Sequence, residues 1–346
     1  MSNWFSRLFG RDVKTAATSR LVSLAAGRVS RWLPRALPAQ IEAGYARNAV
    51  ANRCVRLIVE AAADVPFRAS DPAVQRLLDR PNAETSGPEL WEKLYGYLQL
   101  AGNGYLELVT LDGEPRELFS LRPDRMRVLA DPTGWPTGWE YGAGGYKRRF
   151  ERDPSTGRSQ VFHMRLFHPS DDHYGLSPLE PAGRAVDLHT AGADWARALL
   201  DNAARPSGAL VFNGADGHLT EDQFERLKGE LANTHTGAAN AGRPLLLEGG
   251  LDWKPMAMSP AEMDFIEARR EAAREIALAF GVPPLILGLP GDNTYANYRE
   301  ANLAFIRQTV TPLVRKTARA LSVWLQPWFG GTLTIEAELP DPEATP

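Results

Sequence analysis

The chain has 346 residues, of which 44% are hydrophobic and 23% are charged, and its formal net charge is −3. These values are typical of a globular protein with a packed core, long enough for one large domain or two ordinary ones. The charge disfavours a tight sequence-specific DNA binder, which is usually basic, but suits a protein that surrounds DNA and lets it slide. Cys54 is the only cysteine, which excludes an intrachain disulfide and a four-cysteine zinc site.

The first 40 residues are predicted to form a loosely ordered arm. Residues 1–11 place aromatic residues beside Arg7 and Arg11, without a continuous apolar core or a small-residue cleavage site, so they do not resemble a secretory signal. No run approaches the roughly 18 apolar residues that span a bilayer. We expect an arm that docks on a neighbouring subunit, and the alternative is a short amphipathic membrane anchor.

Apolar residues at helical spacing predict helices over residues 45–63, 72–79 and 88–100. Each stretch is followed by a residue that ends or interrupts helices, namely Pro66, Pro81 or Gly102.

The pattern then changes to that of strands. Residues 105–111 and 117–121 flank Asp112-Gly113, the strongest short signal for a β-hairpin turn. Further short strands, punctuated by glycines, are predicted to about residue 167. The first half is therefore predicted to be an α+β domain with an antiparallel sheet.

Helix starts in the second half share a capping box, in which a serine or threonine precedes a glutamate or glutamine by three positions. These starts lie at Ser177, Thr220 and Ser259. The first helix is predicted to run to about Ala204, which is about 40 Å at 1.5 Å per residue. Its charged residues of mixed sign allow two interpretations, which the pattern supports equally. The helix either has a solvent-exposed face or packs side by side with copies of itself.

A small β-α-β-β insert is predicted between the first and third of these helices. Its strands are expected at residues 207–212, 244–248 and 251–255, and its helix at 221–232. The loop 233–242, rich in Gly, Asn, Ala and Thr, is expected to be mobile.

The third helix is predicted over residues 260–280, followed by a loop at 285–293 and a last long helix at 295–325. Pro312 lies inside that helix, where it removes a hydrogen bond and is expected to force a kink. Long helices with a small insert between two of them do not close a compact core, so the pattern predicts an oligomer.

Short motifs along the chain resemble, in their order and spacing, those of the portal family of phages with the HK97 type of head. The similarity covers about residues 45–328. The motifs are Ala101–Tyr105, Leu121–Pro123, Phe162–Arg165, Tyr174–Leu179, Ala204–Gly208, Leu247–Trp253, Met263–Phe265, Ile276–Pro284 and Thr311–Pro312.

The resemblance implies a structural, non-enzymatic subunit of a ring of about twelve copies, at one vertex of a capsid. Double-stranded DNA would pass through the ring non-specifically during packaging and ejection. The implied partners are the terminase large subunit, the head–tail adaptor and the major capsid protein, with no cofactor and no membrane. The protein would be assembled in the cytoplasm of a bacterial host and end in the virion. The resemblance does not decide whether the particle is a phage, a prophage remnant or a gene transfer agent. The alternative function is a membrane-associated scaffold that uses the N-terminus.

The family's parts are mapped onto the chain by position. The C-terminal tail is so short that the crown must be very small or absent. The mapping gives an N-terminal arm (1–40), a wing (41–175), a stem helix (176–205), a clip (206–258), a second stem helix (259–283), a tunnel loop with the kinked wing helix (284–330), and a tail in the crown position (331–346).

Two sets of site residues follow from this mapping. The tunnel loop is expected to line the narrowest part of the channel, with hydrogen-bonding groups but no lysine or arginine, and the alternative is a plain surface turn. The clip is expected to face the packaging ATPase and later the adaptor. The tunnel-loop residues are Gly288, Gly291, Asp292, Asn293, Thr294 and Tyr295, and the clip residues are Glu225, Lys228, Glu230, Asn233 and Thr234.

Patterns that suggest chemistry are explained better as structure. His163, His168 and His173 recur every five residues, but their spacing does not force imidazoles to converge on a metal. The glycine-rich segment 142–147 lacks phosphate-loop spacing, so packaging energy must come from a partner ATPase. Ser177 is followed by proline and suits a cap better than a nucleophile. The carboxylates Glu262, Asp264, Glu267 and Glu271 alternate with arginines, as on a salt-bridged helix surface.

Overall fold

The computed structural model describes residues 37–201, 208–212, 222, 226, 251–255, 265–289, 294–329 and 331–339. The predicted N-terminal arm, apart from its last four residues, lies outside these ranges.

The first helical segment is interrupted where the sequence predicted one helix. A short helix α1 (Leu37–Ile41) continues as the π-helical turn η2 (Glu42–Ala46), and α2 (Ala49–Ala63) starts afresh. Asn48 causes this break, because its backbone is extended and its Oδ1 accepts hydrogen bonds from the first amides of α2. A side-chain acceptor at this position satisfies amides that have no partner within the helix.

The next two helices match their predicted ranges closely. Helix α3 (Pro72–Asp79) starts at an Asp71 cap, and α4 (Gly87–Ala101) starts at a Ser86–Glu89 capping box. Helix α4 ends at Gly102, whose φ of 69° is a left-handed conformation that glycine adopts at little cost.

The strands form antiparallel sheets, as predicted. Strand β2 (Asn103–Leu111) pairs with β3 (Glu114–Leu121) through a turn at Asp112 and Gly113 in which both φ angles are positive. Strand β7 (Val161–Arg165) lies on the other side of β2, which gives the order β3-β2-β7.

A second sheet consists of β4 (Met126–Ala130), β5 (Pro136–Ala143) and β6 (Tyr146–Glu151). Side chains from both sheets, including Tyr105, Met126, Trp139, Phe150 and Val161, form a small apolar cluster of their own. The single sheet that the sequence suggested is therefore two sheets.

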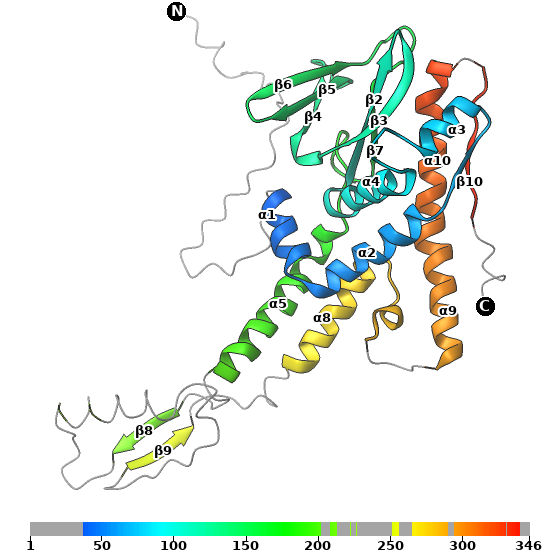
Figure 1. Cartoon of the computed structure of the whole chain (residues 1–346). Helices are drawn as coiled ribbons and strands as arrows, with labels where there is room; N and C mark the ends of the chain where they lie inside the picture. Colours follow the sequence, from blue (N-terminus) through cyan, green and yellow to red (C-terminus); the bar gives the residue numbers. More distant parts are fainter. Residues whose placement is uncertain are drawn as a thin grey trace, which may run out of the picture. The chain divides into compact units, whose positions relative to one another are not determined.

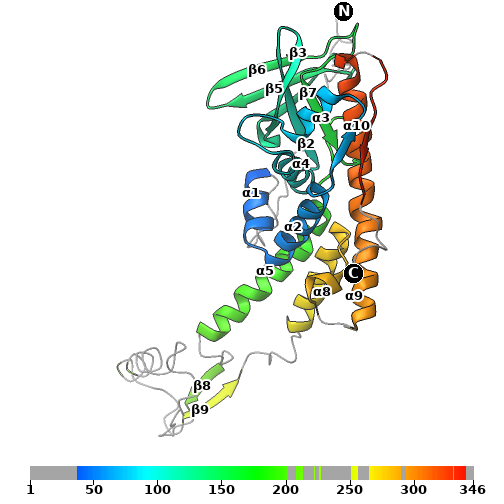
Figure 2. The same cartoon turned by 45° about the vertical axis from the view of Figure 1, so that its right-hand side comes forward.

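Helices α5 (Leu179–Asp201) and α8 (Phe265–Phe280) lie side by side, as both views show (Figures 1 and 2). Small side chains allow this close approach. An added Cβ at Gly192 of α5 would lie 3.8 Å from the Arg269 side chain of α8. These helices correspond to the predicted stem.

Of the predicted insert, the structure describes the antiparallel pair β8 (Gly208–Phe212) and β9 (Leu251–Pro255). Asp222 and Arg226 are helical, as expected for the insert's helix. The predicted strand 244–248, the loop 233–242 and the capping boxes at Thr220 and Ser259 lie outside the described residues.

The last long helix is continuous but not regular. Helix α9 (Tyr295–Phe305) passes through the π-helical turn η6 (Ile306–Val310) into α10 (Thr311–Phe329). Figure 1 shows α9 and α10 as one continuous helix. It extends beyond the predicted end and includes a second proline, Pro327.

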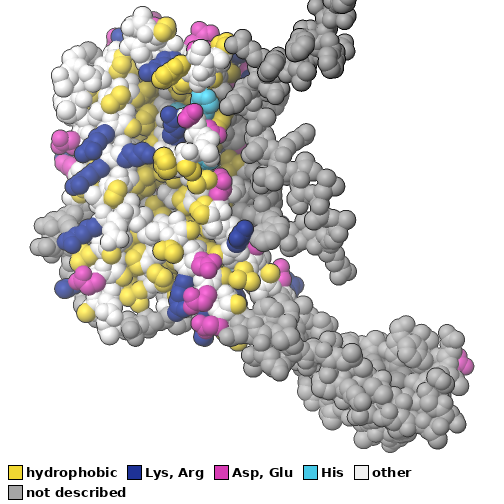
Figure 3. Space-filling model, turned by 180° about the vertical axis from the view of Figure 1, so that it is seen from behind, with side chains coloured by type: hydrophobic (Ala, Val, Ile, Leu, Met, Phe, Trp, Pro, Cys, Tyr) yellow, Lys and Arg dark blue, Asp and Glu magenta, His cyan; other side chains and the backbone are white. Residues whose placement is uncertain are grey.

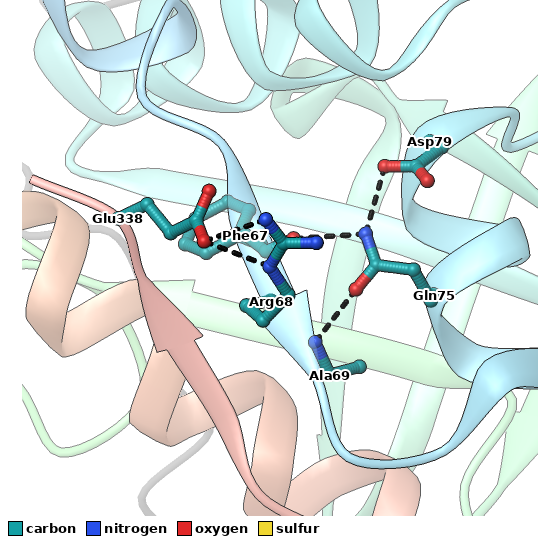
Figure 4. A network of polar contacts seen from close by, with 6 residues as sticks. All are labelled: Phe67, Arg68, Ala69, Gln75, Asp79 and Glu338. Atoms are coloured by element: carbon teal, nitrogen blue, oxygen red, sulfur yellow. Dashed lines mark hydrogen bonds and ion pairs between the residues drawn. The ribbon is translucent and has the colours of Figure 1, made fainter.

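The tail then returns to the first half of the chain, which the sequence did not reveal. Strand β10 (Ile335–Ala337) pairs antiparallel with β1 (Phe67–Ala69). Figure 4 shows the polar contacts around this pair: Arg68 bonds to Glu338 at 2.7 Å, and Gln75 bridges the backbone of Phe67 and Ala69.

The main core lies where α2, α4, α5, α8 and α10 meet. Each fully buried aliphatic side chain there stabilises the fold by about 1.5–3 kcal/mol relative to exposure. Examples are Ile58, Leu94, Leu98, Ile276 and Leu321.

Candidate functional site

The predicted tunnel loop begins at a well-defined helix end. Gly281, with φ of 68°, donates from its amide to Leu278 O at 3.0 Å, and Val282 donates to Ala277 O at 2.9 Å. This is the Schellman arrangement, which satisfies the last carbonyls of α8. Pro283 and Pro284 then prevent the helix from continuing.

The first part of the loop is a folded turn. Residues Pro284–Leu287 form the 3₁₀ helix η5, which ends at Gly288 with φ of 72°. Ile286 and Leu287 are half-buried against the main core. Leu289 donates to Pro284 O at 3.3 Å. The sequence had assigned this stretch to an irregular loop, and its apolar side chains explain why it packs down.

One hydrogen bond fixes the end of α8 against the long helix. Thr309, in the π-helical turn η6, donates from Oγ1 to Gly281 O at 2.6 Å. The end of α8, where the loop begins, therefore lies against η6.

The loop rejoins helix α9 at Thr294, whose Oγ1 accepts from Asn297 N at 3.2 Å and caps the helix. Of the predicted tunnel residues, Gly288 and Thr294 are exposed, and Tyr295 is the first residue of α9. Gly291, Asp292 and Asn293 lie outside the described residues, so the contact of this loop with DNA stays a prediction. All five predicted clip residues, Glu225, Lys228, Glu230, Asn233 and Thr234, also lie outside them.

Pro312 lies inside the long helix, as predicted, two residues after the end of the π-helical turn. The amide of Thr311 donates to Ile306 O, five residues back, instead of four. Pro312 has no amide hydrogen, so the regular α-helical ladder could not continue through it. The sequence predicted the irregularity at this place but not its π-helical form, and the kink itself stays a prediction.

The start of the stem helix α5 is fixed to the end of α4 by a crossing of two glycines. An added Cβ at Gly102 would lie 2.3 Å from Gly175 O, and one at Gly175 would lie 2.0 Å from Gly102 O. Asn103 Oδ1 accepts from Gly175 N at 2.9 Å, and Ser177 Oγ donates to Gln99 O at 2.7 Å. Two of the quoted sequence motifs, Ala101–Tyr105 and Tyr174–Leu179, therefore meet at one joint.

A second polar contact fixes α5 to α2. Asn48 donates from Nδ2 to Val186 O at 3.5 Å and to Thr190 Oγ1 at 3.4 Å, while its Oδ1 caps α2. Asn48 is almost fully buried. Sequence analysis missed it, although an asparagine before an apolar helical stretch is a signal for a cap.

His163 has a structural environment. It stacks on Tyr105 with ring centroids 4.2 Å apart, and its two nitrogens face Trp139 Nε1 and Asn103 Oδ1. Because Trp139 can only donate, His163 Nδ1 is the acceptor and Nε2 carries the proton. Burial, together with Arg165, lowers the pKa of His163 to about 3. Within the described ranges no three His, Cys, Asp or Glu side chains are grouped to hold a metal ion.

The other patterns that suggested chemistry also have structural partners. The glycine-rich segment 142–147 forms the turn between β5 and β6, with Lys147 near Glu140. On α8, Glu267 pairs with Arg270 and Glu271 with Arg274, while Glu262 and Asp264 lie outside the described residues. No helix in the part of the chain that the structure describes is both long and apolar enough to cross a membrane.

This combination, a mixed α/β body joined to a pair of long helices with an antiparallel strand pair between them in sequence, defines a portal-type fold. A family model described as "Phage portal protein" matches residues 49–341, so the chain belongs to the phage portal protein family. The family is structural and not enzymatic.

Three relatives are similar over most of the chain. A protein of Rickettsia bellii described as uncharacterized is 40% identical over 301 residues, covering 84% of this chain and 78% of the relative. A chain in the solved virion of a native gene transfer agent particle is 51% identical with a TM-score of 0.70, and the match covers 89% of this chain and 85% of that chain. A chain in the neck of a native gene transfer agent particle, computed with C12 symmetry, is 51% identical with a TM-score of 0.69, with the same coverage.

Proposed function

We propose that this chain is the portal subunit of a phage-like particle of the gene transfer agent type. About twelve copies form a ring at one capsid vertex, and double-stranded DNA passes through it during packaging and ejection. The observation that carries the proposal is the 51% identity, over 89% of the chain, to a subunit of a twelvefold-symmetric particle neck.

In this proposal the helices α5 and α8 of each copy surround the channel, and the loop 288–295 points into it. The loop contacts phosphates through neutral donors, so few counterions are released per contact and DNA slides easily. The bond from Thr309 to Gly281 supports this role, because it fixes the end of α8, from which the loop starts, against the long helix.

The proposed partners follow the same domain assignment. The insert 206–258 docks the terminase large subunit during packaging and the head–tail adaptor afterwards, and the wing 41–175 meets the major capsid protein. The terminase supplies the energy from ATP. Assembly takes place in the host cytoplasm before the ring enters the virion. The alternative membrane scaffold depends on residues 1–11, and no described feature favours it.

Deletion of Pro290–Asn293 tests the channel function. We expect rings to assemble, since the deletion leaves the flanking helices α8 and α9 intact, but packaging to fail or packaged DNA to leak. Replacement of the same four residues by Gly-Ser-Gly-Ser is the control for loop length. The measurement is the DNase-protected DNA per particle, after ring assembly has been checked. Normal packaging and retention in the deletion would refute the loop's assignment.

A further inference from the structure

Large apolar side chains are exposed along one flank of the long helix. Phe167, just after β7, is 82% exposed, and Leu278, near the end of α8, is 78% exposed. Val323 of α10 is 74% exposed. A single exposed apolar residue needs no explanation, but a group on one surface does.

Two hydrogen bonds place these residues along the same flank. Thr309 bonds to Gly281, three residues after Leu278, and Lys316 Nζ donates to Arg165 O at 2.7 Å, two residues before Phe167. One face of the long helix carries the residues that recur at helical spacing, namely positions 309, 313, 316, 320 and 323. The half-buried Leu313 therefore lies between the two anchoring bonds. We call this surface, with Phe167, Leu278, Leu313 and Val323, the apolar flank.

Cations lie on and beside the apolar flank. Lys316 shares the helix face of Leu313 and Val323 and contacts Arg165, and Arg315 and Arg319 are exposed next to it on α10. Among the described residues none of these four makes an ion pair. Burial, together with Arg165, lowers the pKa of Lys316. Figure 3, seen from behind Figure 1, shows dark blue side chains gathered over α10 near the left edge, beside yellow hydrophobic side chains.

The composition of the flank fits a protein contact. An apolar centre with arginine around it is typical of protein–protein interfaces. Positions 309 to 323 span about 20 Å of helix. Sliding DNA offers no apolar surface of this kind, so DNA would leave Phe167 and Leu278 uncovered.

We infer that the apolar flank is one side of the contact between neighbouring copies of this chain. The inference rests on the proposed function, because a ring needs a contact that repeats around it. Contacts within a ring are heterologous, so the flank meets a different surface of the next copy. That surface must offer an apolar centre and carboxylates at its edge, which neutralise the cations of α10.

The double variant Phe167→Ser, Leu278→Ser tests the inference. Both side chains are exposed, so the subunit should keep its fold, checked by circular dichroism and thermal unfolding. We expect mass photometry to show monomers at protein concentrations where the wild type forms rings. Trp135→Ser is the matched control, because Trp135 is 74% exposed elsewhere and its loss should leave rings intact.

Rings of normal size and stability in the double variant would overturn this inference and leave the proposed function standing. A wild-type protein that stays monomeric would overturn both.

The cations provide an independent test. We expect Arg319→Glu to raise the protein concentration needed for half-assembly at least several-fold, while Arg116→Glu, exposed on β3, has no such effect. If Arg319→Glu instead leaves assembly unchanged and weakens binding of a short DNA duplex to the ring, the cations serve DNA and the interface assignment of this border is wrong.

Discussion

At the residue scale, the sequence predicted best where one side chain decides the local backbone. The ends of α3 and α4 were predicted from Pro81 and Gly102, and the β2–β3 turn from Asp112-Gly113, because each of these residues acts on its immediate neighbours. Contacts between distant residues were not predictable in this way. Asn48 and Ser177 both bond to elements far along the chain, and nothing in their own neighbourhood specifies those partners.

The crossing of Gly102 and Gly175 gives a prediction for stability. We expect Gly175→Ala to lower the free energy of unfolding by about 3 kcal/mol or more, because its Cβ would lie 2.0 Å from a carbonyl oxygen. Gly96→Ala on α4 is the control. It meets nothing within 4 Å and should be neutral or stabilising by up to about 1 kcal/mol. Chemical denaturation measures the free energy of unfolding of both variants. Equal changes in Gly175→Ala and Gly96→Ala would show that the two glycines do not approach each other closely.

His163 gives a prediction for pH. Its folded-state pKa of about 3 lies below its usual value of 6.5. The neutral ring therefore stabilises the fold fully above about pH 6.5, and this contribution is lost as the pH falls toward 3. His163→Gln, which keeps a donor and an acceptor, should remove a slope of up to about 1.4 kcal/mol per pH unit in that window. An unchanged slope in the variant would contradict the assignment.

At the scale of elements, helix existence was predictable and helix irregularity was not. The stem helices and the long helix carry clear periodicity and stop signals, so their main ranges are confirmed. The π-helical turn η6 has no sequence signature beyond the following Pro312. The strand β10 is only three residues long and pairs with β1 some 270 residues earlier, so periodicity could not reveal it.

The proline after the π-helical turn can be tested directly. Pro312→Ala restores an amide that can bond to Gln308 O, so we expect the turn to become regular α-helix. Rings should form, but DNase-protected DNA per particle should fall if the irregularity shapes the channel. Pro327→Ala, in the same helix but far from the loop, is the control and should package normally. A fully viable Pro312→Ala particle would mean that the irregularity is incidental.

The clip residues give a second prediction at this scale. Reversing the charges of Glu225, Lys228 and Glu230 should weaken binding of the terminase and the adaptor while rings stay intact, because charge complementarity guides such docking. Glu114→Lys, exposed on the β2–β3 hairpin, is the control. Pull-down of both partners by variant rings measures the effect, and unchanged binding across the set would count decisively against the clip assignment.

At the scale of the whole molecule, the sequence indicated an oligomer before any family was considered. Two long helices with a small insert between them in sequence leave much surface uncovered within one chain, and the structure adds Phe167, Leu278 and Val323 to that surface. The apolar flank, which we infer meets the next copy, could not be predicted from the sequence, because its residues come from α8, α10 and the segment after β7. Only the fold brings these elements together.

The most direct test of the account is the mass and appearance of the purified full-length protein under assembly conditions. We predict closed rings of about twelve copies with a central hole, seen by negative-stain electron microscopy and weighed by mass photometry. A stable monomer at micromolar concentration would contradict the account.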